Sequence, residues 1–377
     1  MKAKKWLKVF VVLSFFGFLF VGGFNYIVDP YGLYNTNIIS KPKIKQSEKM
    51  RLIKAIRIQE IKPKSICLGS SRTEYGYNPT HKYFIQPSYN LGISGSSVYE
   101  NRLYLEHALE QGHLQKVLLV ADYFQFNTTK QKQIKDIEVY FDNTNIYKYL
   151  FTIDTLKDSY ITLVGSNEPT SVFLNNGQRE HNHRWNTVLY EGGHLKMMNK
   201  SNKIYYKKYS SDYLYADTGQ NSFSDFEYIV KLCYEYNIEL DIIFGPSHIR
   251  QWEALNYYLG YDKWLKWKKD IVESVNKIAT QYVKKPFRIF DFSVYHSLTA
   301  EKVPVDENSK MKYHWESSHY KNELGLIVLD RLVDNSEYRD FGIELNVKNI
   351  DSHLVKQTIK RQQYIDPTKY KLEIWGK

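Results

Sequence analysis

Two short polar segments, far apart in the sequence, carry residue types that could act together in catalysis. Gly69-Ser70-Ser71-Arg72 follows an apolar run, and Glu316-Ser317-Ser318-His319 stands near the end of the chain. A serine in such a turn can expose its hydroxyl at the edge of a sheet, but it becomes nucleophilic only with a base nearby. Because Glu316 and His319 are three residues apart, one turn can aim both at a crevice, with the carboxylate fixing the imidazole tautomer.

Each of these residues also has an ordinary structural interpretation. Ser71 could cap a backbone group, as serines in turns often do. His319 could be a buried histidine with satisfied hydrogen bonds, and Glu316 a solvated residue at the start of a helix. A metal site made of His314, Glu316 and His319 does not match the H-E-x-x-H spacing. We therefore expect no metal, and because no G-x-G-x-x-G or P-loop is present, no nucleotide cofactor.

Other polar residues follow further apolar runs and are candidates for substrate binding. They are Asp122, after the third apolar run, and His248, after Gly-Pro-Ser. Arg72 could hold a phosphate or a uronate carboxylate in a bidentate manner, or could form a structural ion pair instead. His248 could line the cleft or could belong only to a loop. All of them would gather at the carboxyl ends of parallel strands, where open α/β sheets bind ligands.

The elements that must position these residues alternate along the chain. Apolar runs of strand length occur at 65–72, 89–94, 116–124, 240–246 and 287–293. Helical patterns lie between and after them, at 97–111, 223–236, 264–282 and 322–332. Alternating strands and helices predict an α/β fold with a parallel sheet covered on both faces.

The N-terminus predicts the compartment. Residues 9–28 are apolar apart from Ser14 and Asn25, and about 20 such residues in a helix cross a bilayer core of roughly 30 Å. Lysines at 2, 4, 5 and 8 precede this run, which predicts a cytoplasmic N-terminus and an extracytoplasmic domain after residue 28. A cleaved signal peptide is the alternative, but no A-x-A site follows the run. We expect a single-pass anchor in the cell membrane, with Tyr26, Tyr31 and Tyr34 at the interface.

The remaining chain divides into regions by composition. We expect a juxtamembrane strap at 29–60, an α/β domain at 61–340 with an insertion at about 128–222, and a basic C-terminal tail at 341–377. The insertion is rich in Tyr, Asn, Lys and Trp. This composition fits a carbohydrate cleft, but it also fits an ordinary surface in a chain with 33 tyrosines.

Composition excludes several classes of protein. With 377 residues, 43% of them apolar, the chain can bury a substantial core. Two cysteines, Cys67 and Cys233, exclude a disulfide scaffold and a four-thiolate zinc site. The net charge of +11 comes without any nucleic-acid-binding motif. We expect this charge to serve an anionic membrane surface or an acidic polymer rather than nucleic acid.

The polar segments resemble the conserved blocks of the SGNH/GDSL hydrolase superfamily over about residues 61–335. The first block, Gly-Asp-Ser, falls on Gly69-Ser70-Ser71, and the second-block glycine falls on Gly92, with Asn90 before it. The Asp-x-x-His block falls on Glu316-Ser317-Ser318-His319. Ser70 and Glu316 replace aspartates of the family, and Ala121-Asp122-Tyr123 or Asn127 stands where the family has Gly-x-Asn-Asp.

The resemblance implies a flavodoxin-like three-layer sandwich of the SGNH type and a role for each matching residue. Ser71 would be the nucleophile, His319 the general base and Glu316 its orienting acid. The N–H groups of Ser71 and Gly92 would form an oxyanion hole, with Asn90 beside them.

In its N-terminal anchor and its Gly-Ser-Ser form of the first block, the chain resembles the membrane-attached acyl-transfer members of the superfamily. These include the alginate acetylation proteins and the protein that assists D-alanylation of teichoic acids. This implies a serine acyltransferase or esterase that acts on a cell-envelope or exported polysaccharide, or on a teichoic-acid-like polymer. A membrane-bound O-acyltransferase is a candidate partner. The alternative is a catalytically inactive scaffold with the same fold that binds a glycan or such an acyltransferase; the departures from the family blocks and the long insertion support it.

Overall fold

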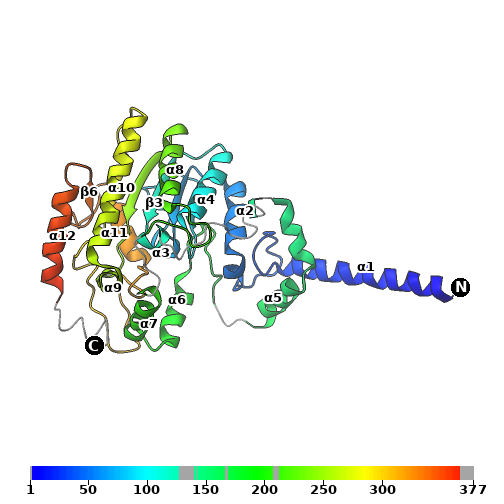
Figure 1. The fold of residues 1–377 in the computed structure, drawn as a ribbon. Helices are drawn as coiled ribbons and strands as arrows, with labels where there is room; N and C mark the ends of the chain where they lie inside the picture. The colour runs from blue at the N-terminus through cyan, green and yellow to red at the C-terminus, as the bar shows by residue number, and fades with distance from the viewer. Residues whose placement is uncertain (1, 127–139, 142, 166–168, 207–211, 366–377) are drawn as a thin grey trace. The chain divides into compact units, whose positions relative to one another are not determined.

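The computed structural model describes residues 2–126, 140–141, 143–165, 169–206 and 212–365. The chain forms two compact units; Figure 1 labels their α-helices and the strands β3 and β6. The first unit combines Met1–Glu60 with Lys135–Leu174, and the second combines Ile61–Ile134 with Asn175–Lys377. The expected strap at 29–60 thus belongs to the first unit, together with the N-terminal helix, and the expected insertion contributes to both units.

The second unit is built on a six-stranded sheet with the order β2-β1-β3-β4-β5-β6. The first five strands are parallel, and they are those that the sequence predicts: β1 (Ser65–Gly69), β2 (Ser88–Gly92), β3 (Lys116–Ala121), β4 (Glu239–Phe244) and β5 (Arg288–Asp291). Nearly all of their residues are buried. Burial on both faces is typical of a parallel sheet covered by helices.

Helices cover both faces of this sheet. On one face, Cys67, Leu118 and Ile243 pack against α11 (Asn322–Leu332) through its residues Leu324 and Val328. Since alternate strand residues point to opposite faces, the intervening residues face the other layer, which contains α4 (Val98–Glu110), α8 (Ser222–Glu235) and α10 (Tyr261–Gln281). The predicted helices are all present, with ends that agree within about three residues.

Two glycines allow α3 (Ser71–Gly76), the short helix after β1, to pack closely on α11. A Cβ added to Gly325 would lie 1.7 Å from the carbonyl oxygen of Gly76, so a larger residue cannot occupy this position without moving a helix. The close approach brings the turn after β1 toward the segment that precedes α11.

The C-terminal region departs from the expected tail. Residues Ile343–Leu345 form β6, which pairs antiparallel with β5, and Ile350–Tyr364 form α12. Inside the fold, His353 of α12 contacts Asp291 (2.8 Å), and the side chain of Gln357 accepts a hydrogen bond from the backbone of Tyr295 (3.3 Å). Residues 366–377 lie outside the described part of the chain.

The remaining helices of the second unit are α6 (His181–Tyr190), α7 (His194–Tyr206) and α9 (Ile249–Leu259), with a short 3-10 helix, η2, at Tyr123–Phe126. In the sequence, α6 and α7 belong to the expected insertion.

The first unit begins with α1 (Lys2–Val28), which is long and apolar enough to cross a membrane, with a mean hydropathy of 2.2 in its most apolar window. The unit also contains η1 (Gln46–Lys49), α2 (Met50–Ile61), η4 (Asn143–Phe151) and α5 (Ile153–Val164). Its small core contains Tyr31, Leu33 and Ile53. Tyr31 is therefore buried in this core rather than exposed in an interfacial belt.

Candidate active site

The turn after β1 presents the hydroxyl of Ser71 at the carboxyl edge of the sheet. Ser70 is the N-cap of α3, where its side chain accepts a hydrogen bond from the backbone N–H of Arg72 (3.3 Å). Ser71 is the first residue of the helix and remains partly exposed. A Cβ on Gly69 would lie 2.2 Å from Oγ1 of Thr73, so the tightness of this turn requires glycine.

Ser71 and His319, which are 248 positions apart, meet at this edge. The Oγ atom of Ser71 lies 2.7 Å from Nε2 of His319. On the other side of the imidazole ring, Nδ1 is hydrogen-bonded to Oε1 of Glu316. The three side chains form a continuous Ser–His–Glu chain of hydrogen bonds, which is the arrangement required to activate a serine.

The electrostatics of the site determine the direction of these hydrogen bonds. Burial raises the pKa of Glu316, but the interactions with His319 and Arg184 outweigh it, so the net pKa is lowered and the carboxylate is ionised. Burial has the opposite effect on His319: it lowers the pKa of the imidazole. This effect is larger than the rise caused by Glu316, so the neutral imidazole is favoured. A carboxylate only accepts, so Nδ1 of His319 donates to Glu316. Nε2 is then free to accept the proton of the Ser71 hydroxyl.

Glu316 is itself held in place by several donors. The backbone N–H groups of Ser318 and His319 donate to its two carboxylate oxygens at 2.9 and 3.0 Å. Arg184 of α6 donates to Oε1 at 3.2 Å. Glu316 is fully buried, so these charge-assisted contacts compensate for the loss of hydration.

The sequence did not identify Arg184 as a site residue, because a single arginine in a polar insertion carries no motif. Tyr75 was also missed. Its ring contacts the imidazole of His319 edge to face, with 5.5 Å between ring centroids, and the Arg184 guanidinium lies 5.7 Å from the Tyr75 ring centroid. Tyr75 and Arg184 therefore limit the positions available to the imidazole and its carboxylate partner.

Arg72 and Asp122, both candidates for substrate binding, pair with each other. Their side chains are buried and form an ion pair of 2.6 Å, and the hydroxyl of Ser70 donates to the same carboxylate. Nε of Arg72 also donates to the carbonyl oxygen (3.2 Å) and the hydroxyl (3.0 Å) of Ser318. These contacts connect the turn of Ser71 to the turn of His319, which gives Arg72 a positioning role.

The candidate oxyanion residues are engaged to different degrees. The N–H of Gly92 donates to Oδ1 of Asn90 (2.9 Å), and the amide nitrogen of Asn90 donates to the carbonyl oxygens of Thr73 (2.9 Å) and Tyr77 (2.7 Å). Asn90 thus holds α3 against β2, and it also accepts the N–H of Gly92. By contrast, Ser71 is the first residue of α3, and the N–H groups of a first helical turn have no partner within their helix. Asn127 lies outside the described residues.

His248 has structural partners on both ring nitrogens. It is the N-cap of α9, where Nδ1 accepts from the backbone N–H of Arg250 (3.2 Å). Nε2 donates to the carbonyl oxygen of Glu301 (2.8 Å). Burial lowers the pKa of His248 well below its ordinary value, which is consistent with a neutral ring. In this structure His248 caps a helix rather than facing a cleft.

His314 also lies apart from the Ser–His–Glu chain. Its Nδ1 is 3.0 Å from Glu301 and its Nε2 is 3.2 Å from the carbonyl oxygen of Pro246. Within the described part of the chain, no group of three or more His, Cys, Asp or Glu side chains is arranged to hold a metal ion.

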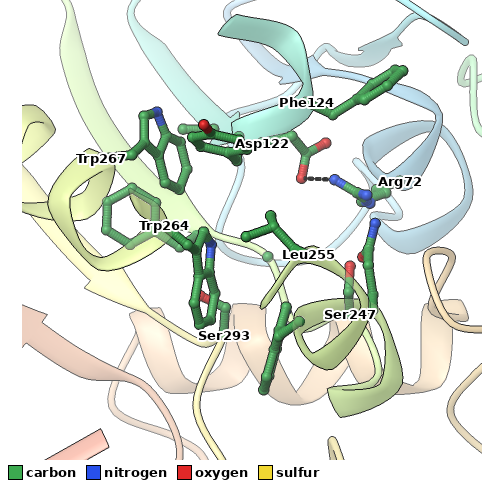
Figure 2. A pocket seen from close by; sticks show the side chains of 14 residues that line it. Arg72, Asp122, Phe124, Ser247, Leu255, Trp264, Trp267 and Ser293 are labelled. Atoms are coloured by element: carbon green, nitrogen blue, oxygen red, sulfur yellow. Dashed lines mark ion pairs between the residues drawn. The ribbon is translucent and has the colours of Figure 1, made fainter. Parts of the chain in front are cut away.

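A pocket lies next to this site, at the carboxyl ends of β3, β4 and β5 (Figure 2). It is narrow and opens to solvent: its volume is about 30 Å³, which is room for roughly two water molecules. Arg72 contributes to its wall, but Ser71 and His319 do not. Aromatic side chains make up much of the lining, with polar groups among them; the lining residues include Asp122, Tyr123, Phe124, Phe244, Ser247, Gln251, Trp252, Leu255, Trp264, Trp267 and Ser293.

The arrangement can deliver a serine oxygen to an electrophilic carbon and receive its proton on an adjacent imidazole. No protein-family model matches this sequence, and no curated protein matches it significantly.

Proposed function

We propose that this protein is a membrane-anchored, extracytoplasmic serine acyltransferase or esterase of the SGNH type that acts on a cell-envelope or exported polysaccharide. The observation that carries the proposal is the 2.7 Å contact between Oγ of Ser71 and Nε2 of His319, with Glu316 on the opposite ring nitrogen. Ser71 is also a partly exposed residue, which supports access of a substrate carbonyl from solvent.

The chemistry follows from this chain of hydrogen bonds. As Oγ of Ser71 attacks the carbonyl carbon of an ester, its proton passes to Nε2 of His319, and Glu316 stabilises the imidazolium. His319 then protonates the departing alcohol, which leaves an acyl group on Ser71. Water or a glycan hydroxyl gives its proton to His319 and attacks the acyl-enzyme. The bond between the acyl carbon and Oγ of Ser71 then breaks, His319 returns the proton to Oγ, and an acid or a new ester is released. Hydrolysis and transfer differ only in this second nucleophile.

The N-terminal helix supports the membrane location. Asn25 and Val28, at the end of α1, are buried in the first unit, with exposed fractions of 0% and 1%. Asn25 donates to the carbonyl oxygen of Leu150 (2.7 Å). Cleavage after this helix would remove these contacts, which favours a retained anchor over a signal peptide. The lysines before the helix favour an outside location for the domain.

The inactive scaffold is the second candidate. The observation in its favour is that Gly92 donates its N–H to Asn90, so this group does not present a free oxyanion donor. Such a protein would bind a glycan or a membrane-bound O-acyltransferase without covalent chemistry.

Covalent labelling distinguishes the two candidates. The full-length protein in detergent is treated with a fluorescent fluorophosphonate, and labelling is followed on a gel. If the protein is a serine enzyme, we expect the wild type to be labelled and Ser71→Ala to abolish the labelling. Ser309→Ala, at an exposed serine of the same unit, should leave the labelling intact. Ester turnover is measured in parallel. Absence of labelling in a folded wild-type protein, or labelling that survives Ser71→Ala, would contradict the proposal.

A further inference from the structure

Helix α5 of the first unit buries its polar side and exposes its apolar side, which is the reverse of what is expected for a helix on a surface in contact with water. Its buried residues are Thr155, Asp158, Ser159 and Thr162, all of them polar. Its exposed side is largely apolar, and it includes Ile153, Tyr160 and Val164 with exposed fractions of 78%, 62% and 63%. An amphipathic helix in water normally buries its apolar stripe, so this orientation indicates that the outer face meets an apolar environment.

Specific contacts hold the polar face inward. The hydroxyl of Tyr31 donates to Oδ2 of Asp158 (2.6 Å), and Lys45 lies 3.4 Å from the other carboxylate oxygen. The hydroxyl of Ser159 donates to Oδ1 of Asn25 in α1 (2.8 Å). Because buried polar groups are costly without partners, these bonds prevent α5 from rotating its apolar side inward.

The adjoining residues contact the apolar part of α1, and α5 lies beside this helix (Figure 1). The rings of Phe18 and Phe151 are 5.8 Å apart, and a Cβ on Gly22 would lie 2.6 Å from the Phe151 ring. At a rise of about 1.5 Å per residue, Phe18 and Gly22 lie roughly 15 and 9 Å from the end of α1 at Val28. If α1 crosses a bilayer core of about 30 Å, Phe151 lies at the depth of its outer leaflet.

The composition of the exposed surface fits a lipid interface. Tyr147, Tyr160, Lys148 and Lys157 are exposed alongside the apolar residues, and Asp154 is the acidic residue on the exposed side of α5. Tyrosine rings favour the boundary between acyl chains and headgroups, and lysines there can extend toward lipid phosphates. The exposed side chains of α1, on which α5 packs, are apolar as well, and they include Phe16, Leu19 and Phe20.

We propose that α5 and the end of η4 form a second membrane-contacting element, which inserts the apolar face of α5 into the outer leaflet beside α1. The occupant of this face is lipid. The element fixes the first unit to the membrane surface at two places, so that the unit cannot rotate freely about α1. This inference does not depend on the catalytic proposal.

The test uses single cysteines in the full-length protein reconstituted into liposomes, with Cys67 and Cys233 replaced by alanine. Ile153→Cys, Tyr160→Cys and Val164→Cys are labelled with an environment-sensitive fluorophore, and lipids carrying a nitroxide on the acyl chain serve as quenchers. Leu13→Cys on α1 is the reference for lipid contact. Val305→Cys, at a residue of the second unit that is 82% exposed, is the reference for water. We expect the α5 sites to show blue-shifted emission and quenching close to that of Leu13→Cys and well above that of Val305→Cys.

Any of the following four outcomes would overturn the proposal. Emission and quenching like those of Val305→Cys would mean that the face lies in water. Protection without quenching, together with cross-linking between chains, would assign the face to a second copy. Exposure in liposomes but protection in native membranes would assign it to a membrane-protein partner. If Leu13→Cys is not quenched in liposomes, α1 does not span the bilayer and the argument from depth fails.

Discussion

Arg184 and His319 donate to the same carboxylate oxygen, Oε1 of Glu316, from segments that are far apart in the sequence. Arg184 lies 3.2 Å from this oxygen. It comes from α6, within the region that the sequence assigns to an insertion, whereas Glu316 and His319 come from the turn before α11. The insertion therefore supplies a group that fixes the acid of the Ser–His–Glu chain and influences its charge.

The carboxylate of Glu316 should be needed for the correct imidazole tautomer. Glu316→Gln keeps the shape of the side chain but offers an amide that can donate to Nδ1 of His319, which favours the tautomer unable to accept the Ser71 proton. We expect kcat/KM for an ester substrate to fall by about 10²–10⁴-fold with the fold intact. Glu316→Asp retains the charge and should lose less. Steady-state kinetics with circular dichroism check this, and full activity in Glu316→Gln would exclude the assigned role.

The charge of Arg184 should set the acidic limit of activity. Burial lowers the pKa of His319 most, and the positive charge of Arg184 lowers it further. Only the neutral imidazole can accept a proton, so activity is present above the pKa of His319 and is lost as the pH falls through it. Arg184→Met should raise this pKa and move the acidic limb of the kcat/KM profile to higher pH.

Arg184→Lys is the matched control, since it retains the charge and should keep most of the original profile. An acidic limb that does not move in Arg184→Met, in a variant that still reacts with the phosphonate, would show that Arg184 does not act electrostatically on His319.

The aromatic pocket beside Arg72 should bind part of the substrate. Phe124 lines it and is partly exposed, so its removal leaves the core intact. If the pocket widens to hold a short acyl group of the substrate, Phe124→Ala should raise KM about tenfold, which corresponds to about 1.4 kcal/mol, with a smaller effect on kcat. Tyr236→Ala, at an exposed tyrosine outside the pocket, is the control. Equal KM values for the wild type, Phe124→Ala and Tyr236→Ala would mean that the substrate does not enter this pocket.

A buried charge cluster should limit stability in acid. Asp291 lies 2.7 Å from Lys268 and 2.8 Å from His353. Burial raises the pKa of Asp291, but Lys268 and His353 lower it to a net value of about 2. Because this pKa is below that of the unfolded chain, near 3.9, the cluster stabilises the fold above about pH 4. That contribution is lost as the pH falls from about 4 to 2.

Asp291→Asn leaves Lys268 buried without its counter-ion, and we expect a loss of about 3–5 kcal/mol in the free energy of unfolding at neutral pH. Urea unfolding at pH 7 and pH 3 measures both effects, with Asp306→Asn on an exposed loop as the control. The difference between Asp291→Asn and the wild type should shrink at pH 3. A loss below about 1 kcal/mol at pH 7 would contradict the role assigned to the cluster.

The residues of the site differ in how far sequence could identify them. The contact between Glu316 and His319 is local, since side chains three residues apart in one turn can meet whatever the rest of the fold does. Ser71 was identifiable because a Gly-Ser-Ser turn follows an apolar strand. Arg184 was not, because nothing in α6 indicates that it faces Glu316. A structural ion pair was one of the two roles left open for Arg72, but its partner, Asp122, could not be named because the pairing depends on β1 and β3 being neighbours in the sheet.

The sequence by itself determined the local elements: an apolar helix long enough to cross a membrane, five buried strands, and the helices between them. Their periodicity and apolar content report which side of each segment is buried, and this is a local property. Only the tertiary structure decided that Ser71 meets His319, that 135–174 joins the N-terminal residues, and that α5 turns its polar face inward. These arrangements depend on which segments, far apart in the chain, can bury their surfaces and satisfy their polar groups together, and no single stretch of sequence carries that information.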